Sequence, residues 1–252
     1  MRRRSIIWAS RLALIAILLI AWEISIEHSK IAKFFLGSPY QIAVLLYEWI
    51  ASGTIFRHLA ITLLETFLSF AIGTGLALLL GLWLALNDTL AAIFDPFIKG
   101  LNSMPRLIMA PIFAVWFGLG IWSKVALGVT LVFFVVFFNV FQGIREVSPV
   151  LLANARMLGA NHYQLIRRVY VPSALSWVFS SLHLSVGLAF VGAVIGEYLG
   201  SSSGVGYLIL EAEGTFDIET VLAGVILLTG FALTLDFAIT LIEQSLLKWQ
   251  AK

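Results

Sequence analysis

Four polar or ionisable side chains stand inside otherwise apolar stretches of the sequence, where groups able to bind a solute are uncommon. They are Asn102, Asn139, His183 and Glu197. Burial of such groups within a bilayer is costly, which makes them candidates for a path along which a solute moves. The alternatives are helix capping or interhelical bonding for Asn102 and Asn139, a packing role for His183, and a wet position for Glu197 near the outer end of its helix.

Residue sets that support enzymatic chemistry are missing. The sequence has no cysteine, which excludes disulfides, thiolate metal sites and thiol catalysis. We also find no paired carboxylates, metal-ligand cluster or nucleophile–base set. We therefore expect a protein that is not an enzyme and that holds no metal or cofactor of its own.

Composition indicates that the bilayer is the solvent for much of the chain. Of 252 residues, 60% are hydrophobic and 12% are charged, whereas soluble domains carry about 25% charged residues. The net charge of +2 comes from dispersed basic residues, which argues against a nucleic-acid partner. These features predict an all-α membrane protein formed by one membrane domain, 1–252.

Six apolar stretches are long enough to cross about 30 Å of hydrocarbon. The first follows three arginines and resembles a signal peptide, but its length and the lack of a small-residue cleavage site favour a retained helix. Between the first two stretches, Ser38 and Pro39 predict the start of a short amphipathic helix at the membrane interface. The six predicted spans are 6–26, 60–86, 100–119, 124–144, 173–197 and 219–246.

The distribution of basic residues predicts the orientation. With the N-terminus in the cytoplasm and six alternating spans, 12 of the 16 Lys and Arg residues fall inside and 4 outside. This excess on the cytoplasmic side agrees with the positive-inside rule and places both termini in the cytoplasm. The inner set is Arg2, Arg3, Arg4, Arg11, Lys99, Arg106, Arg145, Arg156, Arg167, Arg168, Lys248 and Lys252, and the outer set is Lys30, Lys33, Arg57 and Lys124.

The cytoplasmic connection between spans four and five, 145–172, has an unusual composition. Ser148 and Pro149 predict the start of a short helix of small and apolar residues, and Gly159 predicts its end. A second short helix is expected over 161–168, and Pro172 begins the next span. Apolar surface on the water side is costly to expose, which indicates a docking surface.

This connection resembles the EAA loop of ATP-binding cassette (ABC) importer permeases. Ala153-Asn154-Ala155 is followed after three residues by Gly159, and after nine more by Val169 and Val171-Pro172. Further segments, in family order, make nearly the whole chain similar to the nitrate, sulfonate and taurine branch. Two positions depart from the pattern: the usual glutamate of the loop is Ala153, and Glu65 stands where relatives often carry a basic residue. The further segments are Asp95-Pro96, Met104-Pro105, 116–120, 123–124, 196–197 and 204–209.

The resemblance implies a type I importer fold and a permease subunit in a bacterial plasma (inner) membrane, with the loop acting as a coupling helix. The sequence lacks a GxxxxGK[ST] loop, so ATP and magnesium are expected on a separate ATPase dimer. An extracytoplasmic solute-binding protein would deliver the solute to a pore between two copies of the chain, surrounded by lipid. The residues implied in coupling to the ATPase are Ala153, Ala155, Arg156, Gly159, Ala160 and Pro172.

The branch implies a small anion, such as a sulfonate, taurine or nitrate, as the solute, although related systems carry neutral or cationic vitamin precursors. An ion-coupled secondary transporter is the alternative, with Asp236 and Glu65 as its candidate carboxylates. A channel or scaffold subunit would give no reason for the docking loop.

Overall fold

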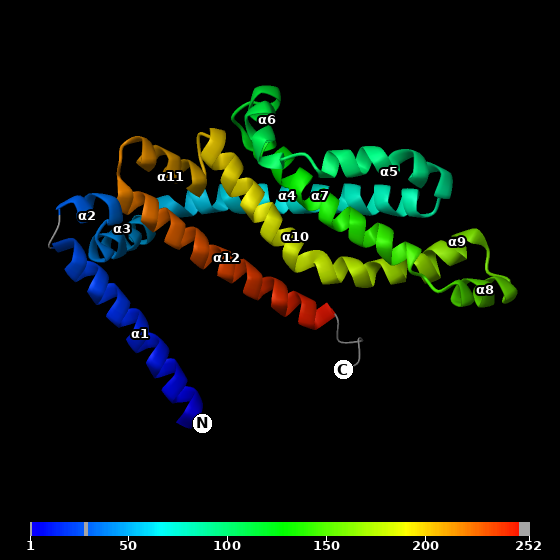
Figure 1. Cartoon of the computed structure of the whole chain (residues 1–252), viewed down its shortest axis with the longest axis horizontal. Coiled ribbons are helices and arrows are strands. Elements are labelled where there is room, and N and C mark those ends of the chain that lie inside the picture. Colours follow the sequence, from blue (N-terminus) through cyan, green and yellow to red (C-terminus); the bar gives the residue numbers. More distant parts are fainter. Residues whose placement is uncertain (1, 28–29, 247–252) are drawn as a thin grey trace.

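Helices account for all the regular structure in the part of the chain that the computed structural model describes, residues 2–27 and 30–246 (Figure 1). The all-α class expected from the sequence is therefore confirmed. In chain order the helices are α1 (Arg2–Glu27), α2 (Lys30–Leu36), α3 (Pro39–Ser52), α4 (Thr54–Ala85), α5 (Asp88–Asn102), the 3₁₀ turn η1 (Arg106–Met109), α6 (Ala110–Phe117), α7 (Ile121–Arg145), α8 (Pro149–Met157), α9 (His162–Leu165), the π-helical turn η2 (Ile166–Tyr170), α10 (Val171–Gly200), α11 (Val205–Gly214) and α12 (Ile218–Leu246).

Four helical stretches among the described residues are long and apolar enough to cross a bilayer. They are Thr54–Ala85, Ile121–Arg145, His183–Gly214 and Ile218–Leu241. The shorter apolar helices Ala13–Ile26 and Arg106–Phe117 fall within the first and third predicted spans. The predicted total of six crossings therefore rests on these two shorter segments.

The third predicted span, 100–119, is not one helix. Helix α5 ends at Asn102, and a 3₁₀ turn separates it from α6. Pro105 lacks a backbone N–H, and a proline disfavours helical backbone at the residue before it, here Met104. A hydropathy average does not register such a break, and the predicted continuous span is corrected to two helices joined at a turn.

The centre of the fold is a three-helix contact between α4, α7 and α10. Gly128 on α7 faces Gly192 on α10 so closely that a Cβ at Gly192 would lie 2.6 Å from the Gly128 Cα. Small residues allow this approach of two backbones, which is the usual way that helices pack in lipid. On the α4 side, Val132 and Val140 are buried against Ala77 and the neighbouring apolar side chains.

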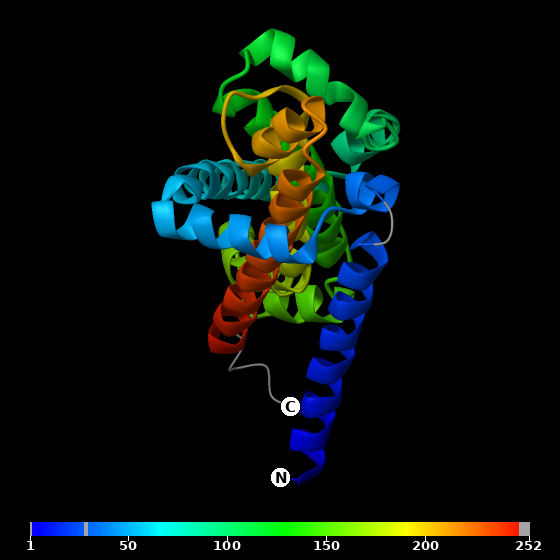
Figure 2. The ribbon, with the colours of Figure 1, turned by 90° about the vertical axis from the view of Figure 1, so that its left-hand side faces the viewer.

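Helix α1 extends away from the rest of the chain in both views (Figures 1 and 2), and its described contacts are chiefly with α2 and α3. Glu23 makes the link: its carboxylate accepts from the Ser38 hydroxyl at 2.8 Å and from the Tyr40 N–H at 3.2 Å. The Ser38 side chain also accepts from the Gln41 N–H, with Pro39 in the first helical turn. Ser38 and Pro39 therefore start α3 as the sequence predicted.

Figure 1 places α8 and α9 at one end of the helical body and α2, α3 and α11 at the opposite end. Two residues of the orientation count, Lys248 and Lys252, lie outside the described residues. A third, Lys124, was counted on the outer side as the first residue of the fourth predicted span; it lies in the first turn of α7 and is 1% exposed. Its side chain is therefore buried within the protein, and the side of the membrane on which it was counted stays a prediction.

Candidate functional site

The loop between α7 and α10 carries the turn that the sequence predicted around Gly159. Gly159 has φ +83°, in the left-handed region where glycine is favoured. Pro149 lies in the first turn of α8, as predicted, but Ser148 makes no side-chain capping bond at the N-cap position, which corrects its predicted role. Asn161 instead caps α9 in a reciprocal pair with Gln164, in which both side chains accept from backbone N–H groups at 2.9 Å.

The second predicted helix of the loop, 161–168, is shorter than expected. Helix α9 ends at Leu165, and a π-helical turn leads without a break into α10. Pro172 lies in the first turn of α10, directly after the π-helical turn. A movement of the loop can therefore be transmitted to α10 through continuous helical backbone.

The loop exposes large apolar side chains that no described part of the chain covers. Leu158 is 89% exposed, Met157 is 84% exposed and Val150 is 67% exposed. Among the residues predicted to couple to an ATPase, Ala153, Arg156, Gly159 and Pro172 are exposed, and Ala155 and Ala160 are half-buried. Such a concentration of exposed apolar groups is typical of a protein–protein contact.

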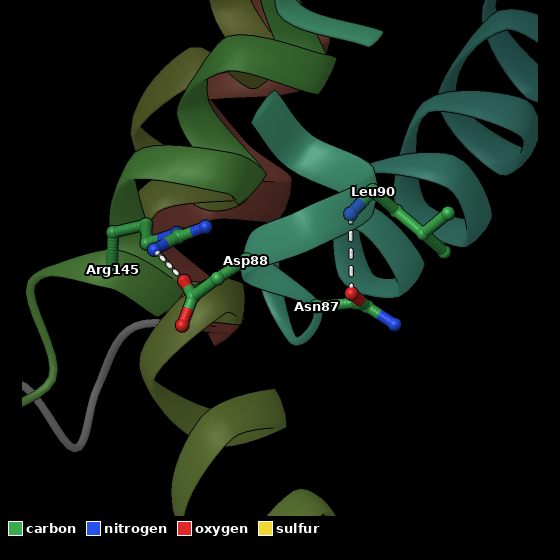
Figure 3. Close-up of polar contacts among 4 residues, drawn as sticks. All are labelled: Asn87, Asp88, Leu90 and Arg145. Atoms are coloured by element: carbon green, nitrogen blue, oxygen red, sulfur yellow. Dashed lines mark hydrogen bonds and ion pairs between the residues drawn. The ribbon is translucent and has the colours of Figure 1, made fainter. Parts of the chain in front are cut away.

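The start of this loop is held beside the turn between α4 and α5 (Figure 3). Arg145, the last residue of α7, donates to the Asp88 carboxylate at 2.5 Å, and the Asn87 side chain accepts from the Leu90 N–H at 3.2 Å. Because the Asp88 side chain is 88% exposed, the ion pair contributes at most about 1 kcal/mol. Its effect is to set the position of the loop more than to stabilise the fold.

The four residues predicted to line a path do not come together within one chain. Asn102 accepts from the Arg106 guanidinium, and the Asn139 amide donates to the Val135 carbonyl of its own helix at 2.8 Å. The Asn102 bond joins the end of α5 to the 3₁₀ turn that follows it, and the Asn139 bond stays within α7. Neither bond joins two packed helices, which was one of the alternatives for these residues. Both asparagines are partly accessible in the described structure.

His183 lines a cavity of about 270 Å³ between α10 and α12. Its Nε2 lies 3.1 Å from the Thr240 hydroxyl and 3.4 Å from the Asp236 carboxylate. The rest of the lining is largely apolar and includes Phe190 and Ile239. Asp236 on α12 therefore pairs with His183 on α10. Of the predicted path residues, His183 lines this cavity.

Glu197 is fully buried, and the structure places two other charged residues near it. Glu65 on α4 and Lys124 on α7 are each 1% exposed, and Glu197 on α10 is 0% exposed. The sequence marked Glu65 as a departure from its relatives but did not associate it with Glu197 or Lys124. The available signal was the presence of a carboxylate and a lysine in apolar helices, where an unpaired charge is not tolerated.

These features define a class: a helical protein with four stretches long and apolar enough to cross a bilayer, and with an exposed apolar loop between α7 and α10. Residues 77–248 match the family described as binding-protein-dependent transport system inner membrane component. The chain belongs to this family, and it is the permease subunit of an ABC importer. Such a permease acts in the inner membrane with an ATPase, which binds the ATP, and with a solute-binding protein.

Individual relatives and a solved structure agree with this assignment. The chain is 34% identical to the aliphatic sulfonates transport permease of Bacillus subtilis (strain 168), covering 96% of this chain and 88% of that protein. It is 32% identical to the formylaminopyrimidine transport permease of Halalkalibacterium halodurans, covering 93% of each. An amino acid ABC transporter crystal structure shares the fold with a TM-score of 0.62 at 20% identity, covering 79% of this chain and 97% of that chain.

Proposed function

We propose that two copies of this chain form the translocation pathway of the importer and that the 145–172 loop of each copy docks on an ATPase subunit. The observation that carries the proposal is the exposed apolar loop built around a left-handed glycine. Small residues there permit close approach to a partner, and Arg156, Arg167 and Arg168 add charge for its acidic rim. Closure of the ATPase dimer would then move α10 through the continuous helical turn and switch the pathway between its two open states.

The contribution of a second copy is supported by α1. Its exposed apolar side chains include Leu14, Ile17 and Leu18, which are 58%, 62% and 60% exposed. Only α2 and α3 pack substantially against this helix in the described chain. We propose that the second copy and membrane lipid share the remaining surface of α1. Both termini are proposed to lie in the cytoplasm, with α1 and the α5–α6 segment completing six crossings.

The proposed solute is a small anion such as a sulfonate, taurine or nitrate. The support is the 34% identity to the aliphatic sulfonates permease. The formylaminopyrimidine permease, which is named for a different solute, is 32% identical to this chain. The candidate path residues are Asn102, Asn139, His183 and Glu197, of which His183 lines a cavity. No phosphate loop is present in the sequence, so ATP and magnesium are assigned to the partner.

Purification of the tagged chain from native membranes in mild detergent, with partners identified by mass spectrometry, tests this assembly. We expect an ABC ATPase and a solute-binding protein to co-purify, and the ligand of the binding protein then identifies the solute. Recovery of the chain without an ATPase, at a detergent concentration that preserves other ABC complexes from the same membranes, would contradict the proposal.

The docking surface can be located by single-cysteine crosslinking, because the chain has no native cysteine. We expect Ala153→Cys to crosslink to the ATPase with a short thiol-reactive reagent, since Ala153 is exposed on α8. Ala51→Cys is the matched control: it is also an exposed alanine in a helix, but it lies on α3 at the opposite end of the body. Equal crosslinking from both positions, or from Ala51 alone, would refute the proposed surface.

A further inference from the structure

Three ionisable side chains are buried near α11, and of these only Glu197 has been given a role so far, as a candidate path residue. Glu65, Lys124 and Glu197 come from α4, α7 and α10, and each is at most 1% exposed. Burial of a charge within a membrane protein is costly unless other charges and hydrogen bonds compensate for it. The bonding of each group therefore indicates what the cluster does.

Glu197 is bonded to the turn that begins α11. One carboxylate oxygen accepts from the Thr62 hydroxyl at 2.6 Å, and the other accepts from the Gly206 N–H at 2.8 Å. The Thr62 hydroxyl oxygen in turn accepts from the Val205 N–H at 3.2 Å. The carboxylate thus satisfies, directly or through Thr62, two N–H groups that have no partner within α11, at the helix end that favours negative charge.

The turn itself is shaped to reach this carboxylate. Gly204 has φ +106°, and a Cβ there would overlap the Glu197 carboxylate. A Cβ at Gly206 would lie 2.9 Å from the Cβ of Glu197. One helical turn before Thr62 on α4, His58 Nδ1 accepts from the Gly204 N–H at 3.1 Å. Helices α4 and α10 therefore hold the 201–206 turn at consecutive backbone N–H groups.

Lys124 binds a second loop at the same end of the body. Its ammonium group donates to the carbonyls of Leu119 at 2.5 Å and Gly120 at 3.0 Å, in the loop between α6 and α7. Its side chain packs beside Gly196, the residue before Glu197, where an added Cβ would lie 2.9 Å from the Lys124 Cγ. The buried cluster therefore contains one lysine, Lys124, and two carboxyl groups, those of Glu65 and Glu197.

Glu65 completes the cluster. Its Oε2 is buried without a hydrogen-bond donor among the residues that the structure describes. Glu65 follows Thr62 by three residues on the same face of α4. Because Thr62 is bonded to Glu197 at 2.6 Å, the two buried carboxyl groups are neighbours. Two carboxyl groups can share a hydrogen bond only if one of them carries a proton. With Glu65 protonated, Lys124 charged and Glu197 ionised, the cluster has no net charge.

We propose that Glu65 is a protonated carboxylic acid that donates its hydrogen bond to Glu197, and that with Lys124 it forms a neutral latch holding the 201–206 turn and α11 onto α4, α7 and α10. Glu65 is a positioning residue in this arrangement, because it acts on the turn through Glu197. The latch rests on the proposed function and deepens it. With both termini in the cytoplasm, as proposed above, the latch lies at the outer end of the pathway and holds that end closed. Glu197 is then assigned to the latch instead of to the path.

The test compares two isosteric substitutions, Glu65→Gln and Glu197→Gln, in the assembled transporter in right-side-out membrane vesicles. The reporter is Val205→Cys, a fully buried position in the turn, labelled with a membrane-impermeant maleimide and read as a mass shift of the tagged chain. Glu65→Gln keeps an N–H donor facing Glu197, so labelling should stay at the level of the reporter alone. Glu197→Gln removes the acceptor charge and leaves Lys124 without its counter-charge. Its labelling should rise about tenfold or more, the order expected when a buried charged hydrogen bond loses one partner.

The asymmetry between these variants decides the proposal. If Glu197→Gln fails to accumulate in the membrane while Glu65→Gln accumulates normally, the difference between the variants is a difference in the amount of folded chain, and it also supports the latch. Equal labelling of the two variants, or higher labelling of Glu65→Gln, would overturn the assignment of the proton. Co-purification of the ATPase is measured on the same samples. Its loss in the unsubstituted chain would count against the proposed function, whereas an altered labelling pattern with the ATPase still bound counts against the latch alone.

Discussion

Replacement of Gly159 by valine should uncouple ATP hydrolysis from uptake while the protein still inserts and folds. The backbone there has φ +83°, and a β-branched side chain in that region costs about 1–3 kcal/mol. A Cβ at Gly159 would meet no atom of the chain within 4 Å, so the packing of the permease is not disturbed. The strain instead displaces the surface formed by Met157 and Leu158. We expect uptake per molecule of transporter to fall roughly tenfold or more, in line with a backbone strain of this size.

Gly53→Val is the matched control for this prediction. Gly53 also has a left-handed conformation, with φ +76°, and a Cβ there would approach only Phe56, at 4.0 Å. It lies between α3 and α4, far from the docking loop in Figure 1. Uptake and ATPase activity, normalised to the amount of chain in the membrane, should remain coupled in this variant. If Gly159→Val transports normally, or if Gly53→Val loses coupling to the same extent, the assignment of the loop is wrong.

Gly192→Ala should prevent the chain from reaching its folded state in normal amounts. The added Cβ would lie 2.6 Å from the Gly128 Cα and 3.1 Å from the Gly128 nitrogen, atoms of a backbone that cannot rotate away. Overpacking of a close-packed core costs about 1–3 kcal/mol, and sometimes more. Because this contact joins α7 to α10 at the centre of the fold, we expect lower membrane accumulation and a lower thermal midpoint in detergent.

Gly187→Ala is the control on the same helix. A Cβ at Gly187 meets nothing within 4 Å, and alanine is a better helix former than glycine. The thermal midpoint of this variant should therefore equal or exceed that of the unsubstituted chain. A normal midpoint for Gly192→Ala would show that α7 and α10 are not in close contact in the membrane.

Local rules predicted the features that depend on neighbouring residues. Ser38 and Pro39 start α3, and Gly159 adopts the left-handed conformation, because caps and turns are set by residues close in sequence. Ser148 is the exception: it stands at the N-cap of α8, but its side chain makes no cap bond. Hydropathy identified the long helices and overlooked the break at Pro105, because a window average contains no information on backbone geometry.

The buried cluster could not be predicted in the same way. Lys124 occupies the first turn of an apolar helix; the sequence placed it at the outer end of the fourth span but gave no sign that its side chain is buried. Its ammonium group is bonded to carbonyls of the preceding loop, and its side chain packs beside Gly196 of α10. Glu65 and Glu197 lie 132 residues apart, and only the packing of α4 against α10 brings them together. Partners that are distant in sequence have no local signature.

The most direct test of the central claim is the energy source of uptake. The chain, its ATPase and its binding protein are reconstituted in proteoliposomes, and uptake of the solute identified in the co-purified binding protein is measured with ATP alone and with an ion gradient alone. An importer permease predicts uptake that requires ATP and is lost on removal of the ATPase or the binding protein. Uptake by the chain alone, driven by an ion gradient without ATP, would contradict the account and identify a secondary transporter.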